Sequence, residues 1–144
     1  MRRIKFRGKC VADSKYAGQW VYGGYSEPQE DCKQNEGLIT VYLGGSSTCK
    51  YHVIPNTVGQ FTGLRDSIGR EIYEGDIIRS FDSKGEPIIH YLLYDNEEAG
   101  FVAILKGCAK GDFGYGRCYQ QWITEREKEV IGNIHDNPEL LKGE

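Results

Sequence analysis

The sequence of 144 residues contains no long apolar run and no paired cysteines. No window approaches the roughly 18 apolar residues of a membrane-spanning helix, and no run of signal-peptide length follows the basic start. The cysteines are odd in number and widely spaced, whereas a zinc site needs clustered thiolates or imidazoles. We therefore expect a cytoplasmic protein with reduced thiols, no metal or other cofactor, and no membrane contact. The cysteines are Cys10, Cys32, Cys49, Cys108 and Cys118.

Long amphipathic helices are also missing, because no stretch repeats its apolar residues every 3.6 positions. Glycine is abundant, with 19 residues, and proline is scarce, with four. Short apolar or alternating segments recur between turn residues at intervals of about 8–12 positions, which is typical of all-β domains. The pattern predicts a mainly β fold with little helix: a short-stranded small barrel, SH3-like or related, together with an N-terminal β-layer.

The chain length suits one domain, 1–144. A composition break at Pro55-Asn56 indicates possible sub-structure, with the N-terminal β-layer in 1–55 and the C-terminal β-barrel in 56–144. The expected strands are 4–7, 20–25, 38–43, 51–54, 60–62, 71–73, 77–81, 87–94, 101–105, 119–124 and 130–134. A short helix is expected to begin after Asn137.

No residue set has the spacing of an active site. The carboxylate pairs Glu74 with Asp76 and Glu97 with Glu98 stand in predicted turns, whereas general acid–base work needs two carboxyls that face one cleft. No serine, cysteine or histidine stands in the context of a catalytic nucleophile, and no glycine-rich run ends in the Lys-Ser/Thr of a phosphate loop. We therefore expect no enzymatic activity and no catalytic residues.

Basic residues are concentrated at the start of the chain. The net charge is −3, yet residues 1–25 contain six basic residues and one acidic residue. Five of them form a candidate nucleic-acid-binding strand that would suit a phosphate backbone: Arg2, Arg3, Lys5, Arg7 and Lys9. Alternatively, these charges protect an edge strand from self-pairing, or they are simply a solvated start of the chain. We favour the second interpretation, because the rest of the chain is acidic and would repel nucleic acid.

A second candidate surface is the glycine-rich segment 107–117. Its binding residues would be Lys110, Phe113, Tyr115 and Arg117, which could stack on bases or hold a peptide. The alternative is a hairpin tip without a binding role. Tyrosine outnumbers phenylalanine by ten to five, and tyrosine suits shallow cores and interfaces. This composition favours a homo-oligomer that self-associates through a tyrosine-rich β surface.

The remaining conspicuous residues predict turns rather than chemistry. Glycines and asparagines recur where short strands must be joined, and Asp76 after Gly75 can cap a turn through its carboxylate. The residues assigned to this structural motif are Gly59, Gly63, Gly69, Gly75, Asp76, Gly132, Asn133 and Pro138.

Three segments together carry a family resemblance: Ile4-Lys5-Phe6-Arg7 with the downstream Trp20-Val21-Tyr22-Gly23, the run from Thr57 to Ile78, and the run from Glu129 to Leu140. In this order they resemble the YopX-like proteins of bacteriophages and prophages. The resemblance implies a phage or prophage protein in a bacterial host cell, and it implies no particular chemistry. The leading hypothesis is a non-enzymatic binding module for an unknown host or phage macromolecule. The alternative is a nucleic-acid-binding small β-barrel that uses the basic N-terminal strand.

Overall fold

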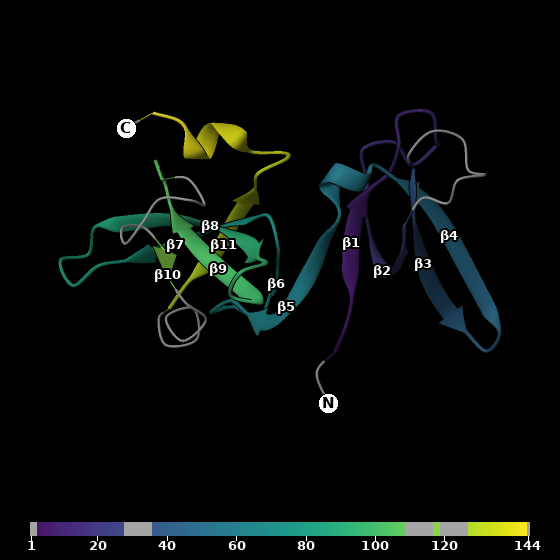
Figure 1. Cartoon of the computed structure of the whole chain (residues 1–144), viewed down its shortest axis with the longest axis horizontal. Coiled ribbons are helices and arrows are strands. Elements are labelled where there is room, and N and C mark those ends of the chain that lie inside the picture. The colour runs from purple at the N-terminus through teal and green to yellow at the C-terminus, as the bar shows by residue number, and fades with distance from the viewer. Residues whose placement is uncertain (1–2, 28–35, 109–116, 119–126, 144) are drawn as a thin grey trace. The chain divides into compact units, whose positions relative to one another are not determined.

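The computed structural model describes residues 3–27, 36–108, 117–118 and 127–143 (Figure 1). Strands make up 55% of the structure and helices 6%, which confirms the prediction of a mainly β protein with little helix. The helices in these ranges are short 3-10 turns, η1 (Pro55–Thr57) and η2 (Pro138–Leu141). Within the described ranges, no helix has the length and hydrophobicity to cross a membrane.

The chain divides into two compact units, Met1–Phe61 and Thr62–Glu144. Strand β5 (Gly59–Arg65) runs through the boundary, a few residues after the composition break at Pro55-Asn56. Its first residues pair with β1 in the N-terminal unit, and it is also a neighbour of β6 (Glu71–Tyr73). The passage between the units is therefore a strand and not a loop.

The N-terminal unit is an antiparallel sheet in the order β4-β3-β2-β1-β5. Its strands besides β5 are β1 (Phe6–Lys9), β2 (Trp20–Ser26), β3 (Gly37–Gly44) and β4 (Ser47–Val53). Because strand side chains alternate between the two faces, one face collects the buried Ile39 and Val53. Gly8 lies against this core, where an added Cβ would stand 2.9 Å from the Cβ of Val53.

The C-terminal unit contains a second antiparallel sheet in the order β10-β9-β8-β7-β11. Its strands are β7 (Asp76–Phe81), β8 (Pro87–Asp95), β9 (Gly100–Leu105), β10 (Arg117–Cys118) and β11 (Glu129–Asn133). Its core is built from fully buried apolar residues of β6 to β9, with Leu64 and Val130 packed against them: Ile72, Ile78, Leu92 and Ala103. The predicted strand 119–124 lies outside the described residues.

The predicted barrel is wrong, because neither sheet is closed. In the N-terminal unit the edge strand β4 reaches β1 only at the end of β1, where Cys10 forms an isolated bridge with Val53 in the described structure. Two backbone hydrogen bonds flank this bridge, from Val11 N–H to His52 O (3.1 Å) and from Ile54 N–H to Lys9 O (2.9 Å). In the C-terminal unit the edge strands β10 and β11 do not pair with each other in the described structure. A barrel needs a continuous ladder around its circumference, and the short edge strands do not supply one.

The turn from β6 to β7 depends on Gly75. Its φ is +90°, in the left-handed region that favours glycine. Its N–H donates to Leu92 O (2.7 Å), and its carbonyl accepts from Ile134 N–H (2.9 Å). The turn thus also ties β8 to the segment that follows β11, so its conformation is held from two sides.

We expect Gly75→Val to lower the free energy of unfolding by roughly 1–3 kcal/mol, because a β-branched residue is strained at positive φ. Chemical denaturation measures the effect. Gly100→Val is the matched control in the same unit, since Gly100 has no positive φ and an added Cβ would stand 3.9 Å from its nearest neighbour, Glu98 O. Equal denaturation midpoints for Gly75→Val and the unmodified protein would contradict this reading of the turn.

Candidate functional site

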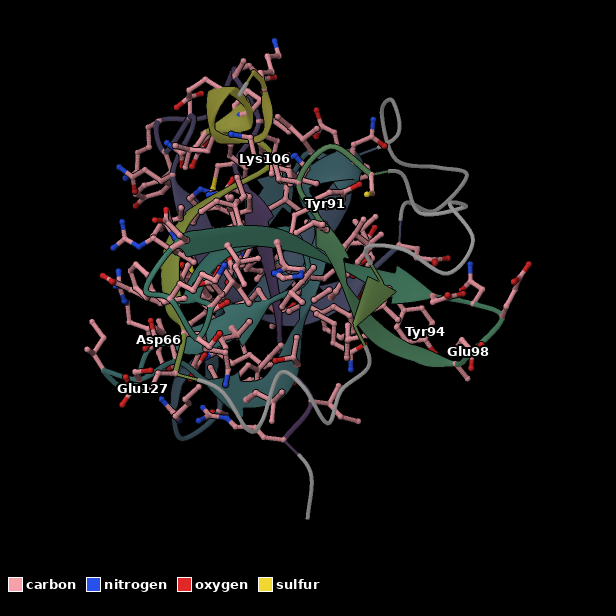
Figure 2. All side chains as sticks on the ribbon, turned by 90° about the vertical axis from the view of Figure 1, so that its left-hand side faces the viewer. Asp66, Tyr91, Tyr94, Glu98, Lys106 and Glu127 are labelled. Atoms are coloured by element: carbon pink, nitrogen blue, oxygen red, sulfur yellow. The ribbon has the colours of Figure 1, made fainter. Side chains whose placement is uncertain are left out.

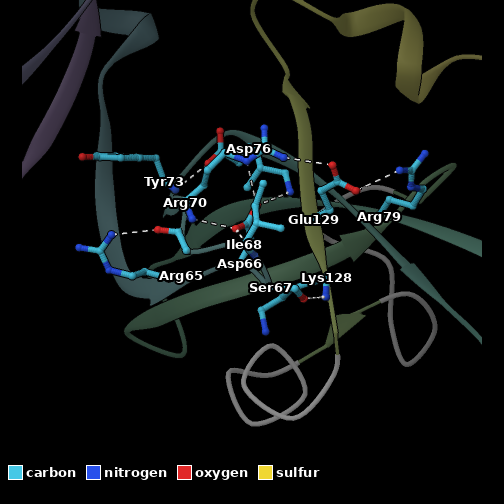
Figure 3. A network of polar contacts seen from close by, with 12 residues as sticks. Arg65, Asp66, Ser67, Ile68, Arg70, Tyr73, Asp76, Arg79, Lys128 and Glu129 are labelled. Carbon is cyan, nitrogen blue, oxygen red and sulfur yellow. Dashed lines mark hydrogen bonds and ion pairs between the residues drawn. The ribbon is translucent and has the colours of Figure 1, made fainter.

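The most extensive polar network of the C-terminal unit surrounds the loop Asp66–Arg70 (Figure 3). The Asp66 side chain has no exposed surface. Its Oδ1 accepts the N–H groups of Ile68 (3.1 Å) and Arg70 (2.8 Å). The Asp66 N–H donates to Arg70 O (2.8 Å), so this carboxylate organises its own loop.

The second carboxylate oxygen connects the loop to β11. Oδ2 of Asp66 accepts the N–H of Val130 (3.2 Å) and Nε of Arg70 (3.2 Å). Beside it, Ser67 N–H donates to Lys128 O (2.9 Å) and Lys128 N–H donates to Ser67 Oγ (2.9 Å). The central run and the C-terminal run of the sequence are therefore joined by hydrogen bonds between residues about 60 positions apart.

Charged side chains continue the network along β11. Glu129 accepts from Arg70 Nη2 through Oε1 (3.1 Å) and from Arg79 Nη2 through Oε2 (3.1 Å). Arg70 thus bridges the buried Asp66 and the half-exposed Glu129 (Figure 3). The ion pairs lie at the rim, where solvent screens them, so we assign the main stabilising role to the buried carboxylate.

Burial alone would raise the pKa of Asp66. The N–H groups of Arg70, Val130 and Ile68 and the Arg70 charge together outweigh burial and lower this pKa below its ordinary value. The pKa of Lys128 is lowered by burial, against the opposing effect of Asp66. An ionised carboxylate has about four acceptor positions, and four donors occupy those of Asp66. The Asp66 carboxylate therefore has a structural role rather than a role in proton transfer or metal binding.

A second loop repeats the local geometry of the first. Asp82 Oδ1 accepts the N–H groups of Lys84 (2.8 Å) and Glu86 (2.9 Å), and Asp82 N–H donates to Glu86 O (2.9 Å). Both loops read Asp-Ser-X-Gly-X in the sequence. This repeat was not among the sequence-based predictions, although the five-residue pattern is visible in the sequence. Asp66 additionally accepts the N–H of Val130 in the distant strand β11, and the short pattern does not indicate that contact.

The turn residues of the sequence motif lie where backbone geometry requires them. Asp76 is 1% exposed, and its Oδ2 accepts Tyr73 N–H (2.8 Å) across the β6–β7 turn. This bond places the Asp76 carboxylate in a structural role, and its suggested partner Glu74 stands in the same turn. Gly63 and Gly69 have φ values of +87° and +89°. Gly59 lies opposite Arg7 in the pairing of β5 with β1.

The C-terminal motif is a set of asparagine turns. Asn133 Oδ1 accepts the N–H groups of His135 (3.0 Å) and Asp136 (2.9 Å). Asn137 Oδ1 accepts Asn133 N–H (3.2 Å), and a Cβ on Gly132 would lie 2.5 Å from that oxygen. Gly132 therefore leaves room for the turn, and Pro138 begins η2 directly after it.

The second acidic pair, Glu97 and Glu98, is exposed in the β8–β9 turn. Glu97 N–H donates to Asp95 Oδ1 (2.9 Å), as in an ordinary aspartate turn. Figure 2 shows Glu98 beside Tyr94 at this turn, at the opposite end of the hairpin from Tyr91 and Lys106. No group of three or more metal-ligating side chains occurs in the described part of the chain, and Cys10, Cys49 and Cys108 are free thiols.

The cations of β1 lie against aromatic rings of β2. Arg7 is 7% exposed, with Cζ 4.7 Å from the centroid of the Trp20 ring. Lys5 is half-buried, with Nζ 5.7 Å from the centroid of the Tyr22 ring. These are cross-strand cation–π contacts, which stabilise neighbouring strands. Of the other predicted nucleic-acid contacts, Lys9 is half-buried, Arg3 is exposed, and Arg2 lies outside the described residues.

The glycine-rich loop contributes little to the described structure. Lys110, Phe113 and Tyr115 lie outside the described residues. Arg117 belongs to β10, and its backbone pairs with Ile104 of β9. The structure therefore gives no geometry for this predicted binding loop.

One face of the N-terminal sheet displays aromatic residues to solvent. Tyr42 of β3 is 77% exposed and Tyr22 of β2 is 43% exposed. Gly24 lies opposite Thr40, and Thr40 lies opposite the exposed Lys50 of β4. We call this set the open face: Tyr22, Gly24, Thr40, Tyr42 and Lys50.

These features define a mainly β protein whose recognised motifs build turns and whose aromatic residues are partly displayed on a sheet face. The chain belongs to the YopX family: the family model described as YopX protein matches residues 5–142. It is also similar to the crystal structure of protein EF1440 from Enterococcus faecalis, with a TM-score of 0.53 and 21% identity. That match covers 99% of this chain and 100% of the other, and it shows a shared fold alone. No curated protein matches the chain.

We expect Asp66→Asn to lower the free energy of unfolding at neutral pH by roughly 1–3 kcal/mol, since a hydrogen bond to a buried charge is lost. The folded-state pKa of Asp66 lies below the unfolded value of about 3.9, so the unfolded chain binds more protons in acid. The Asp66 contribution is therefore complete above that value and disappears as the pH falls through the folded pKa. Urea titrations between about pH 2 and 7 measure both effects.

Asp82→Asn is the matched control, because Asp82 has the same loop geometry and is partly exposed. We expect it to cost clearly less and to leave the acid dependence due to Asp66 in place. Equal losses in the two variants would show that the connection to β11 contributes nothing beyond the loop itself.

Proposed function

We propose that this YopX protein is a non-enzymatic binding module, encoded by a phage or prophage, that binds a macromolecule of the bacterial host cell or the phage. The observation that carries the proposal is the exposure of two tyrosines, Tyr22 and Tyr42, on one face of the N-terminal sheet. Tyrosine combines a large apolar ring with a polar hydroxyl, which makes it a common contact at binding surfaces.

The character of the polar residues supports a binding role over catalysis. In the described structure, the carboxylates of Asp66 and Asp76 accept backbone N–H groups from their own turns. A general acid or base needs a titratable group in reach of a substrate, and these two are committed to structure. The rings of Tyr22 and Tyr42 are 43% and 77% exposed, so a partner could reach both of them.

Nucleic-acid binding through the basic strand β1 is the second candidate. Exposed Arg3 and half-buried Lys5 and Lys9 favour it. Arg7 does not, because it is 7% exposed and lies over Trp20. A phosphate contact would therefore rest on the cations beside Arg7 rather than on Arg7 itself.

A capture experiment tests the binding module. The immobilised protein is incubated with lysate of phage-infected bacteria, and bound proteins and nucleic acids are quantified. We expect Tyr22→Ala with Tyr42→Ala to reduce capture of at least one macromolecule by about tenfold or more, because central interface tyrosines are typical binding hot spots. Phe81→Ala is the control, since Phe81 is 54% exposed and belongs to the C-terminal unit. Equal capture by the double variant and the control would contradict the proposal.

The same face predicts self-association. Light scattering should give a mass above the 16.3 kDa of one chain, and the double tyrosine variant should return it to one chain. Closed homo-oligomers are the usual result when a surface pairs with its own copy. A strictly monomeric unmodified protein would end this prediction without affecting the binding of another macromolecule.

A further inference from the structure

One residue of the open face, Gly24, carries no side chain. The pairing Gly24–Thr40–Lys50 runs across β2, β3 and β4. A Cβ added to Gly24 would meet no atom within 4 Å, so the space over this backbone is open. Tyr22 and Tyr42 are each two residues from the Gly24–Thr40 pair, and antiparallel pairing directs both toward the same end of the sheet. The Gly24–Thr40 pair is thus bordered by two exposed rings at one end and by Lys50 at one side.

Cations accompany these rings. Lys5 Nζ lies 5.7 Å from the centroid of the Tyr22 ring. Lys50 is exposed and forms no ion pair with the residues that the structure describes. Glu36, near the other end of these strands, contacts His52 Nδ1 at 3.2 Å. Lys50 therefore has no carboxylate partner among the described residues, and Glu36 is paired with His52 instead.

The net charges of the two units have opposite signs. Residues 1–61 contain eight basic and five acidic residues, for +3, and residues 62–144 contain ten basic and sixteen acidic residues, for −6. Together these give the net charge of −3 of the whole chain. An anionic ligand is therefore attracted to the N-terminal unit and repelled by the C-terminal unit.

We infer that the open face binds single-stranded nucleic acid, which deepens the proposed function and rests on it. The tyrosine rings stack on bases, and Lys5 and Lys50 contact phosphates. A duplex keeps its bases stacked inside and cannot offer them to Tyr22 or Tyr42. The carboxylates of an acidic peptide would pair with the lysines. They would leave the exposed rings and the open space over the Gly24 backbone without a complementary group.

Fluorescence anisotropy with a labelled oligothymidylate of about 15 nucleotides tests the inference. We expect the unmodified protein to bind it at least about tenfold more tightly than a duplex of equal length, because only the single strand can stack on the rings. Tyr42→Ala should weaken binding by about 5- to 150-fold, the loss of one stacked base. Lys50→Glu should reduce the slope of log affinity against log salt by about 0.7, the loss of one phosphate contact.

The C-terminal unit supplies controls matched in chemistry. Phe81 is an exposed aromatic with Arg79 Cζ 5.7 Å from its ring centroid, so Phe81→Ala imitates the loss of a cation-backed ring. Lys84 is an exposed lysine in the β7–β8 turn, so Lys84→Glu imitates the charge reversal. Both should leave the affinity unchanged. The tested side chains are exposed, and unchanged circular dichroism checks that each variant is folded.

Three results would overturn the inference. The first is no binding of the oligothymidylate by the unmodified protein near 150 mM salt and at about 20 mM salt. The second is binding that neither Tyr42→Ala nor Lys50→Glu weakens. The third is tighter binding of polyglutamate than of the oligonucleotide, which would assign an acidic protein instead. If capture from lysate still depends on the two tyrosines in these cases, the binding-module proposal stands while its nucleic-acid partner falls.

Discussion

The Asp66 carboxylate is the contact on which the polar structure of the C-terminal unit depends. It has no exposed surface, and its two oxygens accept four hydrogen bonds from Ile68, Arg70 and Val130. A buried charge is tolerated only when it is this well compensated, and removal of its donors would leave a costly unpaired ion. The same group therefore fixes a local loop and a long-range strand contact, so the loop cannot reorganise without loosening β11.

The loop Asp82–Glu86 shows how little of this role is local. It has the same Asp-Ser-X-Gly-X sequence and the same three backbone contacts as the loop Asp66–Arg70. The two loops differ in the contacts of the second carboxylate oxygen, Oδ2. In Asp66 this oxygen accepts the N–H of Val130. Short-range turn chemistry thus decides that both loops form, whereas the packing of β11 decides which aspartate becomes a tertiary anchor.

Much of the β structure was predictable because strand alternation and glycine turns are local signals. The segments 38–43, 77–81 and 101–105 fall within strands of the structure, and Gly75 has the positive φ that its turn needs. The open sheets were not predictable, because closure depends on pairing between strands far apart in the sheet, and in the described N-terminal unit that pairing is limited to the bridge between Cys10 and Val53. The role of Asp66 was missed for a related reason: its partner Val130 is 64 residues away, and one sequence carries no pairing information over that separation.

The candidate binding surface, too, could be predicted from the sequence only in part. Abundant tyrosine pointed to a surface, but composition cannot say which rings are exposed. In the structure, Tyr73 is 2% exposed and hydrogen-bonds Glu71, whereas Tyr42 is 77% exposed on β3. The cations of β1 divide likewise, since Arg7 is buried against Trp20 while Lys5 reaches Tyr22. The pairing register of the strands determines which rings and cations are exposed. It decides which side chains share a face and which of them are covered by a neighbouring side chain. The basic strand is therefore partly a structural element, and any recognition of phosphate depends on cations placed beside exposed rings rather than on the number of basic residues near the N-terminus.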